Sequence, residues 1–214
     1  MSAALVTDFG KDSYYILCNE LRRLALRMQQ AIGNVEDISV NASIVASQTG
    51  TQARVFFEIS SQVEKTSRKM HSQIFLLLNA INKLIECVLS SQIDQQRMEH
   101  FAQAKISPNY PSNQQLVEHV QHQYKIYTSM RHRQVVNSVN EIESHFSLFE
   151  FLVNRIFVAL TALRVEEQLF KNQLKLVAVG SLIKSFEKLL VNLSEDYDAF
   201  RDFFMLFKGI DTEQ

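Results

Sequence analysis

His119 and His122 are the residues of this sequence whose spacing comes nearest to a metal site. They lie three residues apart in the segment EHVQHQ, so a helix would place both imidazoles on one face. With Glu118, or with His71 or His100 from elsewhere in the chain, they could complete a zinc site. The alternative is a solvated polar helix face, which is the commoner role for such residues. We therefore expect no metal and no cofactor, and keep His119 and His122 as the metal candidates.

The two cysteines do not have a metal-binding spacing. Cys18 and Cys87 lie far apart in a chain of 214 residues, which is typical of buried free thiols in a reducing compartment. His132 lies between two arginines in the segment RHR. Such a basic spot more often keeps a surface soluble than binds phosphate, so we expect no anion site there.

Motifs of catalysis are absent from the sequence, which has no Gly-rich phosphate loop and no nucleophile elbow. Glu141 and Glu143 are two residues apart, so a helix would point them to different faces instead of pairing them. We expect a protein that is not an enzyme, although helical phosphatases use Gln and Asp side chains that leave little trace in one sequence. A set of phenylalanines could line a lipid or cofactor cavity, but such sets more often form a core. The set comprises Phe146, Phe149, Phe151, Phe157, Phe200, Phe203 and Phe204.

Composition and charge narrow the class of protein. The length suits one domain, and only five glycines and two prolines leave few turns, so long helices are favoured over an all-β fold. A net charge of −1 removes the electrostatic reason to expect nucleic acid or an anionic membrane surface. The N-terminus does not read as a signal peptide, and the most apolar run, Ile74 to Leu89, is interrupted by polar residues. We expect a soluble cytoplasmic protein without a membrane span.

The first helix is expected over residues 14–48, after a capping residue at Asp12 or Ser13. Gly50, between two threonines, offers a reversal because glycine tolerates the left-handed conformation that often follows a helix. The predicted apolar face of this helix comprises Tyr15, Ile16, Leu21, Leu24, Leu26, Met28, Ile32, Val35 and Ile38.

A second helix is expected over residues 52–105, with apolar residues three and four apart that indicate coiled-coil-like packing. Between Phe75 and Leu89 it is apolar on more than one face, which is typical of a helix in the centre of a bundle. Its predicted core residues are Val55, Phe56, Ile59, Val63, Met70, Ile74, Leu77, Ile81, Leu84, Val88, Leu89, Ile93, Met98 and Phe101.

Both prolines lie in the segment SPNYPSN, residues 107–113, which we interpret as a linker because proline disfavours a helix. Ser112 or Asn113 would cap a third helix from about Gln114, and a reversal near 166–172 would lead to a last helix that ends at Gly209. The third helix carries Leu116, Val120, Tyr124, Tyr127, Met130, Val135, Val139, Ile142, Phe146, Phe149, Leu152, Ile156, Leu160 and Leu163. The last helix carries Leu174, Leu176, Val179, Leu182, Ile183, Phe186, Leu189, Leu190, Leu193, Tyr197, Phe200, Phe203 and Phe204.

These four helices predict an all-α, elongated antiparallel four-helix bundle that forms one domain over residues 1–214. One hairpin would span 12–106 and the other 114–208, on either side of the linker at 107–113. The outer helices would have about 40 residues and the inner ones about 53, or roughly 60 and 80 Å at ~1.5 Å per residue. Both reversals would then lie at one end of the bundle and the linker at the other.

The stretch 40–69, VNASIVASQTGTQARVFFEISSQVEKTSRK, resembles the hairpin tip of bacterial chemoreceptor (methyl-accepting chemotaxis protein) signalling domains. That family's pattern runs roughly N-A-x-I-E-A-A-R-A-G-E-x-G-R-G-F-x-V-V-A-x-E-V-R. Several charged positions of the pattern differ here: Val45 replaces a Glu, Gln48 an Arg and Gln62 a later Glu. The matching frame comprises Asn41, Ala42, Ile44, Ala46, Gly50, Arg54, Phe56, Ile59 and Val63.

A second occurrence of the pattern lies in the other half of the chain. The segment ALTALRVE at 159–166 aligns with 43–50, and LVAVGSLIK at 176–184 resembles the later part of the pattern. The family's signalling domain is a four-helix bundle of two identical hairpins, so the resemblance implies two fused hairpins related by a pseudo-two-fold axis. A chance match between helical sequences is the alternative interpretation.

The resemblance implies a non-catalytic cytoplasmic signalling or scaffold protein of chemotaxis-type signal transduction. Its hairpin tip would bind a histidine kinase, a coupling adaptor or a receptor, with polar recognition that differs from the family's. No site suited to adaptive methylation is found. The alternatives are a self-associating structural bundle, or a metal- or ligand-binding bundle, and the chain would be a monomer or a homodimer. The expected partner-binding residues are Val45, Gln48, Arg54, Phe56, Gln62, Arg164 and Glu167.

Overall fold

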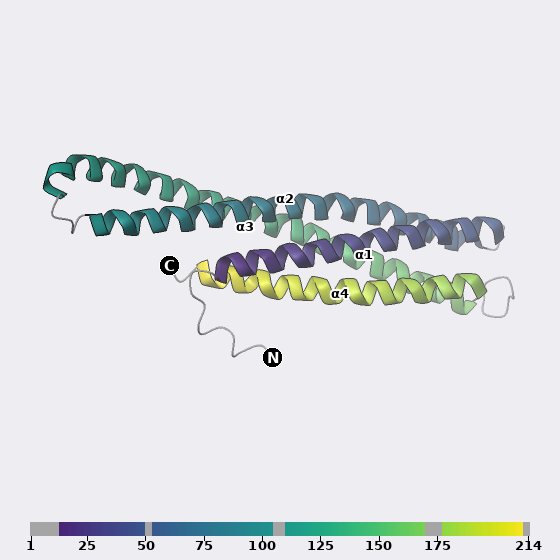
Figure 1. The fold of residues 1–214 in the computed structure, drawn as a ribbon. Helices are drawn as coiled ribbons and strands as arrows, with labels where there is room; N and C mark the ends of the chain where they lie inside the picture. Colours follow the sequence, from purple (N-terminus) through teal and green to yellow (C-terminus); the bar gives the residue numbers. More distant parts are fainter. Residues whose placement is uncertain (1–12, 50–52, 105–109, 170–176, 212–214) are drawn as a thin grey trace.

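The computed structural model describes residues 13–49, 53–104, 110–169 and 177–211, which contain four long α-helices (Figure 1). They are α1 (Ser13–Thr49), α2 (Arg54–Ala104), α3 (Tyr110–Leu169) and α4 (Val177–Asp211). Successive helices run in opposite directions and pack against one another along a rod. The predicted all-α antiparallel four-helix bundle is confirmed. We call the end of the rod where α1 and α3 end and α2 and α4 begin the tip end.

The helix bounds confirm most of the predicted boundaries and correct two of them. α3 begins at Tyr110, so the predicted linker is helical from that residue on, and neither Ser112 nor Asn113 is its cap. Pro111 lies in the first turn, where a missing amide costs nothing because the first amides of a helix have no partner within it. Gly209 lies inside α4 and does not end it. Asp12, Gly50, Leu174, Leu176 and residues 105–109 lie outside the described residues.

The core of the bundle follows a seven-residue repeat on α2 and on α3. Residues seven apart return to nearly the same face of a helix after two turns, so these rows form continuous apolar edges. Every residue of both rows is 2 % exposed or less. The rows are Phe56, Val63, Met70, Leu77 and Leu84 on α2, and Ile142, Phe149, Ile156 and Leu163 on α3.

Within the two hairpins, the helices pack through side chains of different size: small ones between α1 and α2, and large ones between α3 and α4. Small buried residues such as Ala42, Ala46 and Ser60 let α1 and α2 approach closely along their length. The backbones of α3 and α4 come close at fewer places, because large rings fill the space between them. The ring of Phe146 stacks at 4.7 Å from both Tyr197 and Phe200 of α4. The phenylalanine set is therefore mostly core as predicted, with Phe151 the exception at 56 % exposed.

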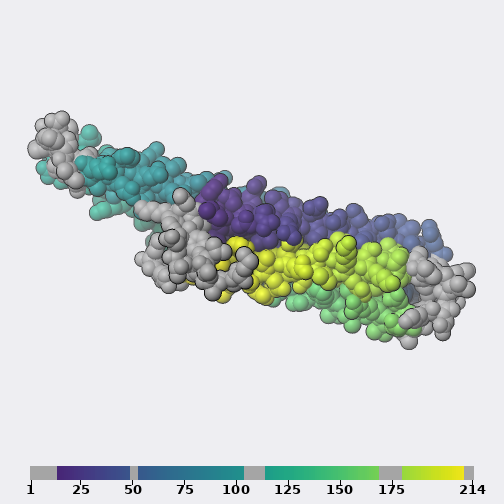
Figure 2. All heavy atoms as spheres, turned by 60° about the horizontal axis from the view of Figure 1, so that its bottom comes forward, coloured from purple at the N-terminus to yellow at the C-terminus, as the bar shows by residue number. Residues whose placement is uncertain are grey.

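Beyond the point where α1 begins and α4 ends, α2 and α3 continue as a pair (Figure 1). No described side chain at 95–103 or 114–137 is buried. We call residues 95–104 and 110–137 the two-helix extension, and the rest of the rod the four-helix section (Figure 2). At the base of the extension Arg131 Nη1 lies 2.9 Å from Asp94 Oδ2, and further out the rings of Phe101 and Tyr124 are 5.5 Å apart.

Several residues predicted as core are exposed. On α1, the buried face passes through Leu17 and Cys18, so Tyr15, Ile16 and Leu26 face solvent at 40–56 % exposure. On α3, residues before Val135 have no neighbouring α1 or α4 to cover them, which leaves apolar side chains of the extension exposed. The exposed residues that were predicted as core on the other helices are Val55, Leu89, Ile93, Leu116, Tyr127 and Met130.

The apolar middle of α2, residues 75–89, is buried on one face and exposed on another. Leu77 and Ile81 are fully buried, but Phe75 is 58 % and Leu76 41 % exposed, so the prediction of a wholly enclosed segment is wrong. By length and composition alone, α2 and α3 each contain an 18-residue stretch apolar enough to cross a membrane. Core helices of soluble proteins pass the same test, and 39 % of each stretch is buried inside the bundle. Solubility and cytoplasmic location remain predictions.

Candidate functional site

The structure brings the predicted partner-binding residues to the tip end of the rod (Figure 1). They come from three helices whose ends meet there, α1, α2 and α3. This convergence follows from the lengths of the helices, because both hairpins reverse at the same end. The residues are Val45 and Gln48 near the end of α1, Arg54, Phe56 and Gln62 at the start of α2, and Arg164 and Glu167 near the end of α3.

Two of these residues are covered by the bundle itself. Phe56 is 2 % exposed because it opens the buried seven-residue row of α2, and Val45 is half-buried against the core. Phe56 is therefore a core residue of the bundle, and its predicted contact with a partner stays a prediction. Gln48, Arg54 and Gln62 are exposed, as a contact surface requires.

The apolar side chains that the tip end does expose were not predicted as contacts. Ile44 on α1, Val55 and Phe57 on α2 and Val165 on α3 are 42–55 % exposed. A signal for Phe57 was present in the sequence. Val63 and Met70 follow Phe56 at intervals of seven, so Phe56 belongs to the core row and Phe57 must point away from it.

Arg164 and Glu167 are engaged within the bundle. The Arg164 guanidinium donates a hydrogen bond to the Glu187 carboxylate of α4, and this bond raises the pKa of Arg164. Glu167 lies against α4 at Gly180, where a Cβ would come 2.9 Å from its Oε1. Glycine at this position therefore lets α3 and α4 approach closely at the tip end. Arg164 and Glu167 therefore hold α3 against α4. Their side chains are less free to contact a partner than those of Gln48 and Arg54.

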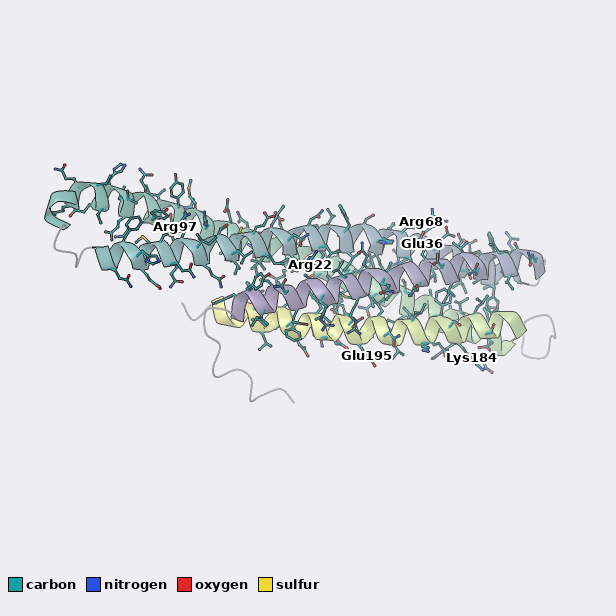
Figure 3. All side chains as sticks on the ribbon, viewed as in Figure 1. Arg22, Glu36, Arg68, Arg97, Lys184 and Glu195 are labelled. Atoms are coloured by element: carbon teal, nitrogen blue, oxygen red, sulfur yellow. The ribbon has the colours of Figure 1, made fainter. Side chains whose placement is uncertain are left out.

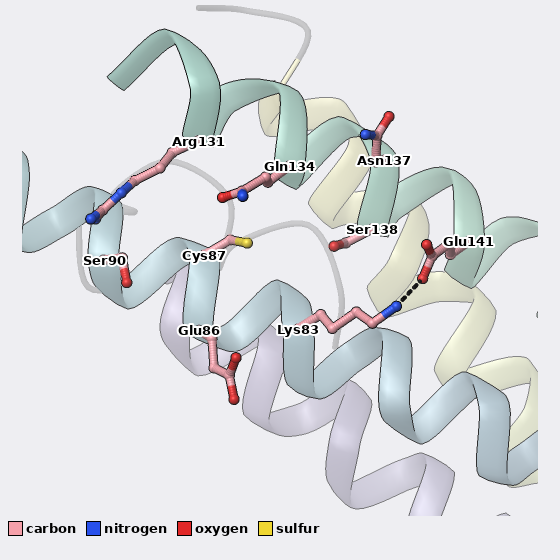
Figure 4. Close-up of a pocket in the computed structure, with 9 residues that line it drawn as sticks. All are labelled: Lys83, Glu86, Cys87, Ser90, Arg131, Gln134, Asn137, Ser138 and Glu141. Atoms are coloured by element: carbon pink, nitrogen blue, oxygen red, sulfur yellow. Dashed lines mark hydrogen bonds and ion pairs between the residues drawn. The ribbon is translucent and has the colours of Figure 1, made fainter. Parts of the chain in front are cut away.

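A polar groove of about 450 Å³ lies between α2 and α3, at the base of the two-helix extension (Figure 4). At one end Lys83 Nζ lies 3.0 Å from Glu141 Oε2 across the groove. At the other end lies Arg131, held by Asp94. Both cations are thus already neutralised by carboxylates, so the groove has no free positive charge for an anion. Its lining residues are Lys83, Glu86, Cys87, Ser90, Arg131, Gln134, Asn137, Ser138 and Glu141.

Cys87 and Ser138 form the floor of this groove (Figure 4). The Ser138 side chain is 5 % exposed and makes no hydrogen bond to a described residue. Burial and the Glu86 carboxylate raise the pKa of the Cys87 thiol, and the Arg131 charge opposes them. The thiol is therefore held in its protonated form, which is a poor nucleophile. Both cysteines are free as predicted, but the predicted burial holds for Cys18 and not for Cys87, which is half-buried.

Charged side chains are spread along the rod, as the six labelled in Figure 3 show. His119 and His122 are exposed on the extension, and in the described parts of the chain no three His, Cys, Asp or Glu side chains are placed to hold a metal. Glu141 pairs with Lys83 of α2, whereas Glu143 pairs with Lys208 of α4 at 2.9 Å. The prediction that these two glutamates point to different faces is confirmed.

Comparison of the chain with protein-family models, curated proteins and solved structures finds no match. No family match therefore supports the chemoreceptor resemblance. What the structure establishes is an all-helical fold of four helices.

Proposed function

We propose that this protein is a non-catalytic signalling or scaffold protein that binds a partner protein at the tip end of its bundle. The observation that carries the proposal is the convergence of exposed apolar and polar side chains at the end where both hairpins reverse. Exposed apolar residues surrounded by polar ones are typical of protein–protein contacts.

The tip end has the composition of a contact surface. Phe57 supplies an aromatic ring that is 42 % exposed, and Ile44 and Val165 supply smaller apolar side chains from two other helices. Arg54 is exposed three residues before Phe57, which places it about one helical turn away, and it forms no ion pair with a described residue. Arginine and aromatic residues are enriched at the energetic centres of interfaces, so Arg54 and Phe57 are the residues on which we expect binding to depend most.

The partner class rests on the resemblance of 40–69 to chemoreceptor tips. In that family the tip binds a histidine kinase and its coupling adaptor, so we propose a kinase, adaptor or receptor of a chemotaxis-type system as the partner. Gln48 and Gln62 replace charged residues of the family pattern. Charged groups contribute to the choice of partner, so the specificity should differ from the family's.

Site-specific photo-crosslinking in the native host tests this proposal. A photoreactive amino acid at Phe57 should yield a discrete adduct, and its partner would be identified by mass spectrometry. The matched control is Phe75, a phenylalanine of the same helix with 58 % exposure that lies away from the tip end. Arg54→Glu should reduce the Phe57 adduct at least tenfold. Equal adducts from both positions, or an Arg54→Glu variant with unchanged adduct, would exclude the tip end as the contact site.

A further inference from the structure

A row of exposed apolar residues runs along the outside of α3. We call the positions that lie at intervals of seven residues from Leu116 to Val165 the outer row. Five of these positions are apolar. Their side chains are 55–72 % exposed, which places them among the most exposed large apolar residues of the protein. They are Leu116, Met130, Phe151, Val158 and Val165.

The outer row is on the opposite side of α3 from the core. In the four-helix section each of its apolar residues follows a buried residue by two positions, as Phe151 follows Phe149 and Val158 follows Ile156. Two residues correspond to about 200° around a helix of 3.6 residues per turn. α3 is therefore apolar on two faces, and this explains why it meets the composition of a membrane-crossing segment while it packs in a bundle.

Apolar residues at intervals of seven on a helix surface form an edge suited to another helix. The outer row also has a property that favours a particular helix. Its polar positions Asn137 and Ser144 lie at its middle, and apolar residues lie on both sides of them. The row therefore reads nearly the same from either end, which is the requirement for an interface with two-fold symmetry.

We infer that a second copy of this chain packs on the outer row, with the two α3 helices antiparallel. About a two-fold axis between residues 140 and 141, Met130 then faces Phe151 of the other copy, and Leu116 faces Val165. Asn137 faces Ser144 at the centre, so polar groups meet polar groups and remain able to form hydrogen bonds. Gln123, which faces Val158, is the one unmatched position of the row.

Charge and area are compatible with this pairing. Glu141 is the charged residue nearest the axis, and Lys83 of the same chain neutralises it at 3.0 Å. The row from Leu116 to Val165 is about 74 Å long at ~1.5 Å per residue. A contact strip about 10 Å wide along it would bury on the order of 1,500 Å² in total, which lies within the range of stable interfaces.

Sedimentation equilibrium of the purified protein tests the dimer. We expect a dimer at micromolar concentration, and Phe151→Glu should weaken it at least 100-fold by placing a charge in an apolar contact. Phe75→Glu is the matched control, because Phe75 is a phenylalanine of similar exposure on α2. Circular dichroism would verify that both variants are folded. A monomeric wild type, or equal weakening by both variants, would overturn the inference.

Disulfide cross-linking tests the antiparallel register. In a variant with Cys18→Ala and Cys87→Ser, the pair Met130→Cys and Phe151→Cys should yield a covalent dimer under mild oxidation. Within one chain these positions are about 32 Å apart along the helix, beyond the reach of a disulfide. Met130→Cys alone should remain monomeric under denaturing conditions. Cross-linking by Met130→Cys alone would mean a parallel dimer and would overturn the register. Val165 belongs to both surfaces, but Phe57 lies outside the outer row, so its photo-crosslinking reports on the tip end independently.

Discussion

The four-helix section and the two-helix extension share the helices α2 and α3 but differ at equivalent positions of the same seven-residue repeat. In the four-helix section this register of α3 holds Ile142, Phe149, Ile156 and Leu163, all fully buried or nearly so. Carried back into the extension it holds Val135 at the boundary and then Thr128, Gln121 and Gln114, of which Thr128 and Gln114 are exposed and Gln121 is half-buried.

α2 changes in the same way and at the same level. Ile74, Ile81 and Val88 are buried, and the next residues of their row are Gln95 and Ala102. Beyond Val135 of α3 and Val88 of α2, most core-facing positions thus turn polar or small where α1 and α4 no longer cover them, and Met98 of α2 is the large apolar exception. The comparison teaches that helix length and core length are encoded separately. A helix can continue as long as its backbone allows, whereas the core continues only while apolar residues occupy the facing positions.

The largest expected effect comes from deleting a ring in the four-helix section. Phe149 is fully buried, so Phe149→Ala removes its transfer free energy and leaves a cavity. We expect the free energy of unfolding to fall by about 3–5 kcal/mol, measured by urea denaturation. A loss below about 1 kcal/mol would show that the four-helix section is as loosely packed as the extension.

The boundary between the two regions depends on Arg131 and Asp94. The Asp94 side chain is 3 % exposed, and Arg131→Ala would leave this buried carboxylate with Arg97, 4.0 Å away, as its remaining cationic neighbour. We expect a loss of about 1–3 kcal/mol in the free energy of unfolding. Asp94→Asn in the Arg131→Ala background should recover part of it. Arg133→Ala, at an exposed neighbour, is the control and should change stability by less than about 0.5 kcal/mol.

Alkaline pH should destabilise the four-helix section through Cys18. Burial raises the pKa of its thiol from 9.0 to about 12. The folded chain therefore keeps a proton that the unfolded chain loses, and the stability this provides is present below pH 9 and declines as pH rises towards 12. We expect a loss of about 1–2 kcal/mol by pH 10.5. Burial and the Glu150 carboxylate also raise the pKa of Tyr197, which adds to the decline at higher pH.

The measurement is urea denaturation at a series of pH values. Cys18→Ala should abolish the part of the slope that begins near pH 9, while Cys87→Ala, at the half-buried cysteine of the boundary, should abolish less of it. Identical pH profiles for wild type and Cys18→Ala would mean that the thiol is not shielded from water.

The smallest effect is expected in the extension. Gln121 has the same register as Phe149 but is half-buried at most. Gln121→Leu should therefore change the free energy of unfolding by less than about 0.5 kcal/mol, since no covering helix is present to bury the new side chain. Stabilisation by more than about 1 kcal/mol, again by urea denaturation, would reveal a surface that covers this face and would remove the distinction between the two regions.

The helices and their order could be predicted from sequence because few glycines and prolines interrupt the apolar periodicity. Exposure along each helix was harder to predict. On α1, apolar residues three and four apart lie on two adjoining faces, and the sequence does not decide which face is buried. That Leu17 and Cys18 lie on the buried face depends on how α2 and α4 pack against α1. On α3, Leu116 and Met130 match the helical periodicity but lie opposite the core, since two apolar rows coexist on one helix.

The candidate site shows the same limit. The tip end could be located from Gly50 and from the matched arm lengths, because these are local or additive properties. The chemoreceptor pattern has a phenylalanine at the position of Phe56, whereas the row Phe56, Val63 and Met70 places this residue in the core and leaves Phe57 exposed. The groove at Cys87 and Ser138 could not have been predicted, because these residues become neighbours only when α2 and α3 pack in one particular register.

The start of α1 lies beside the end of α4, where the rings of Tyr14 and Phe207 meet edge to face at 5.6 Å. This placement decides how the bundle should respond to mechanical force. A pull between Ser13 and Asp211 would load the contacts of α1 and α4 one after another, like a zipper, and should separate them at low force. A pull between the tip end and the extension would load the contacts along the rod simultaneously in shear. The unfolding force should therefore be low for a pull between Ser13 and Asp211 and high for a pull along the axis of the rod.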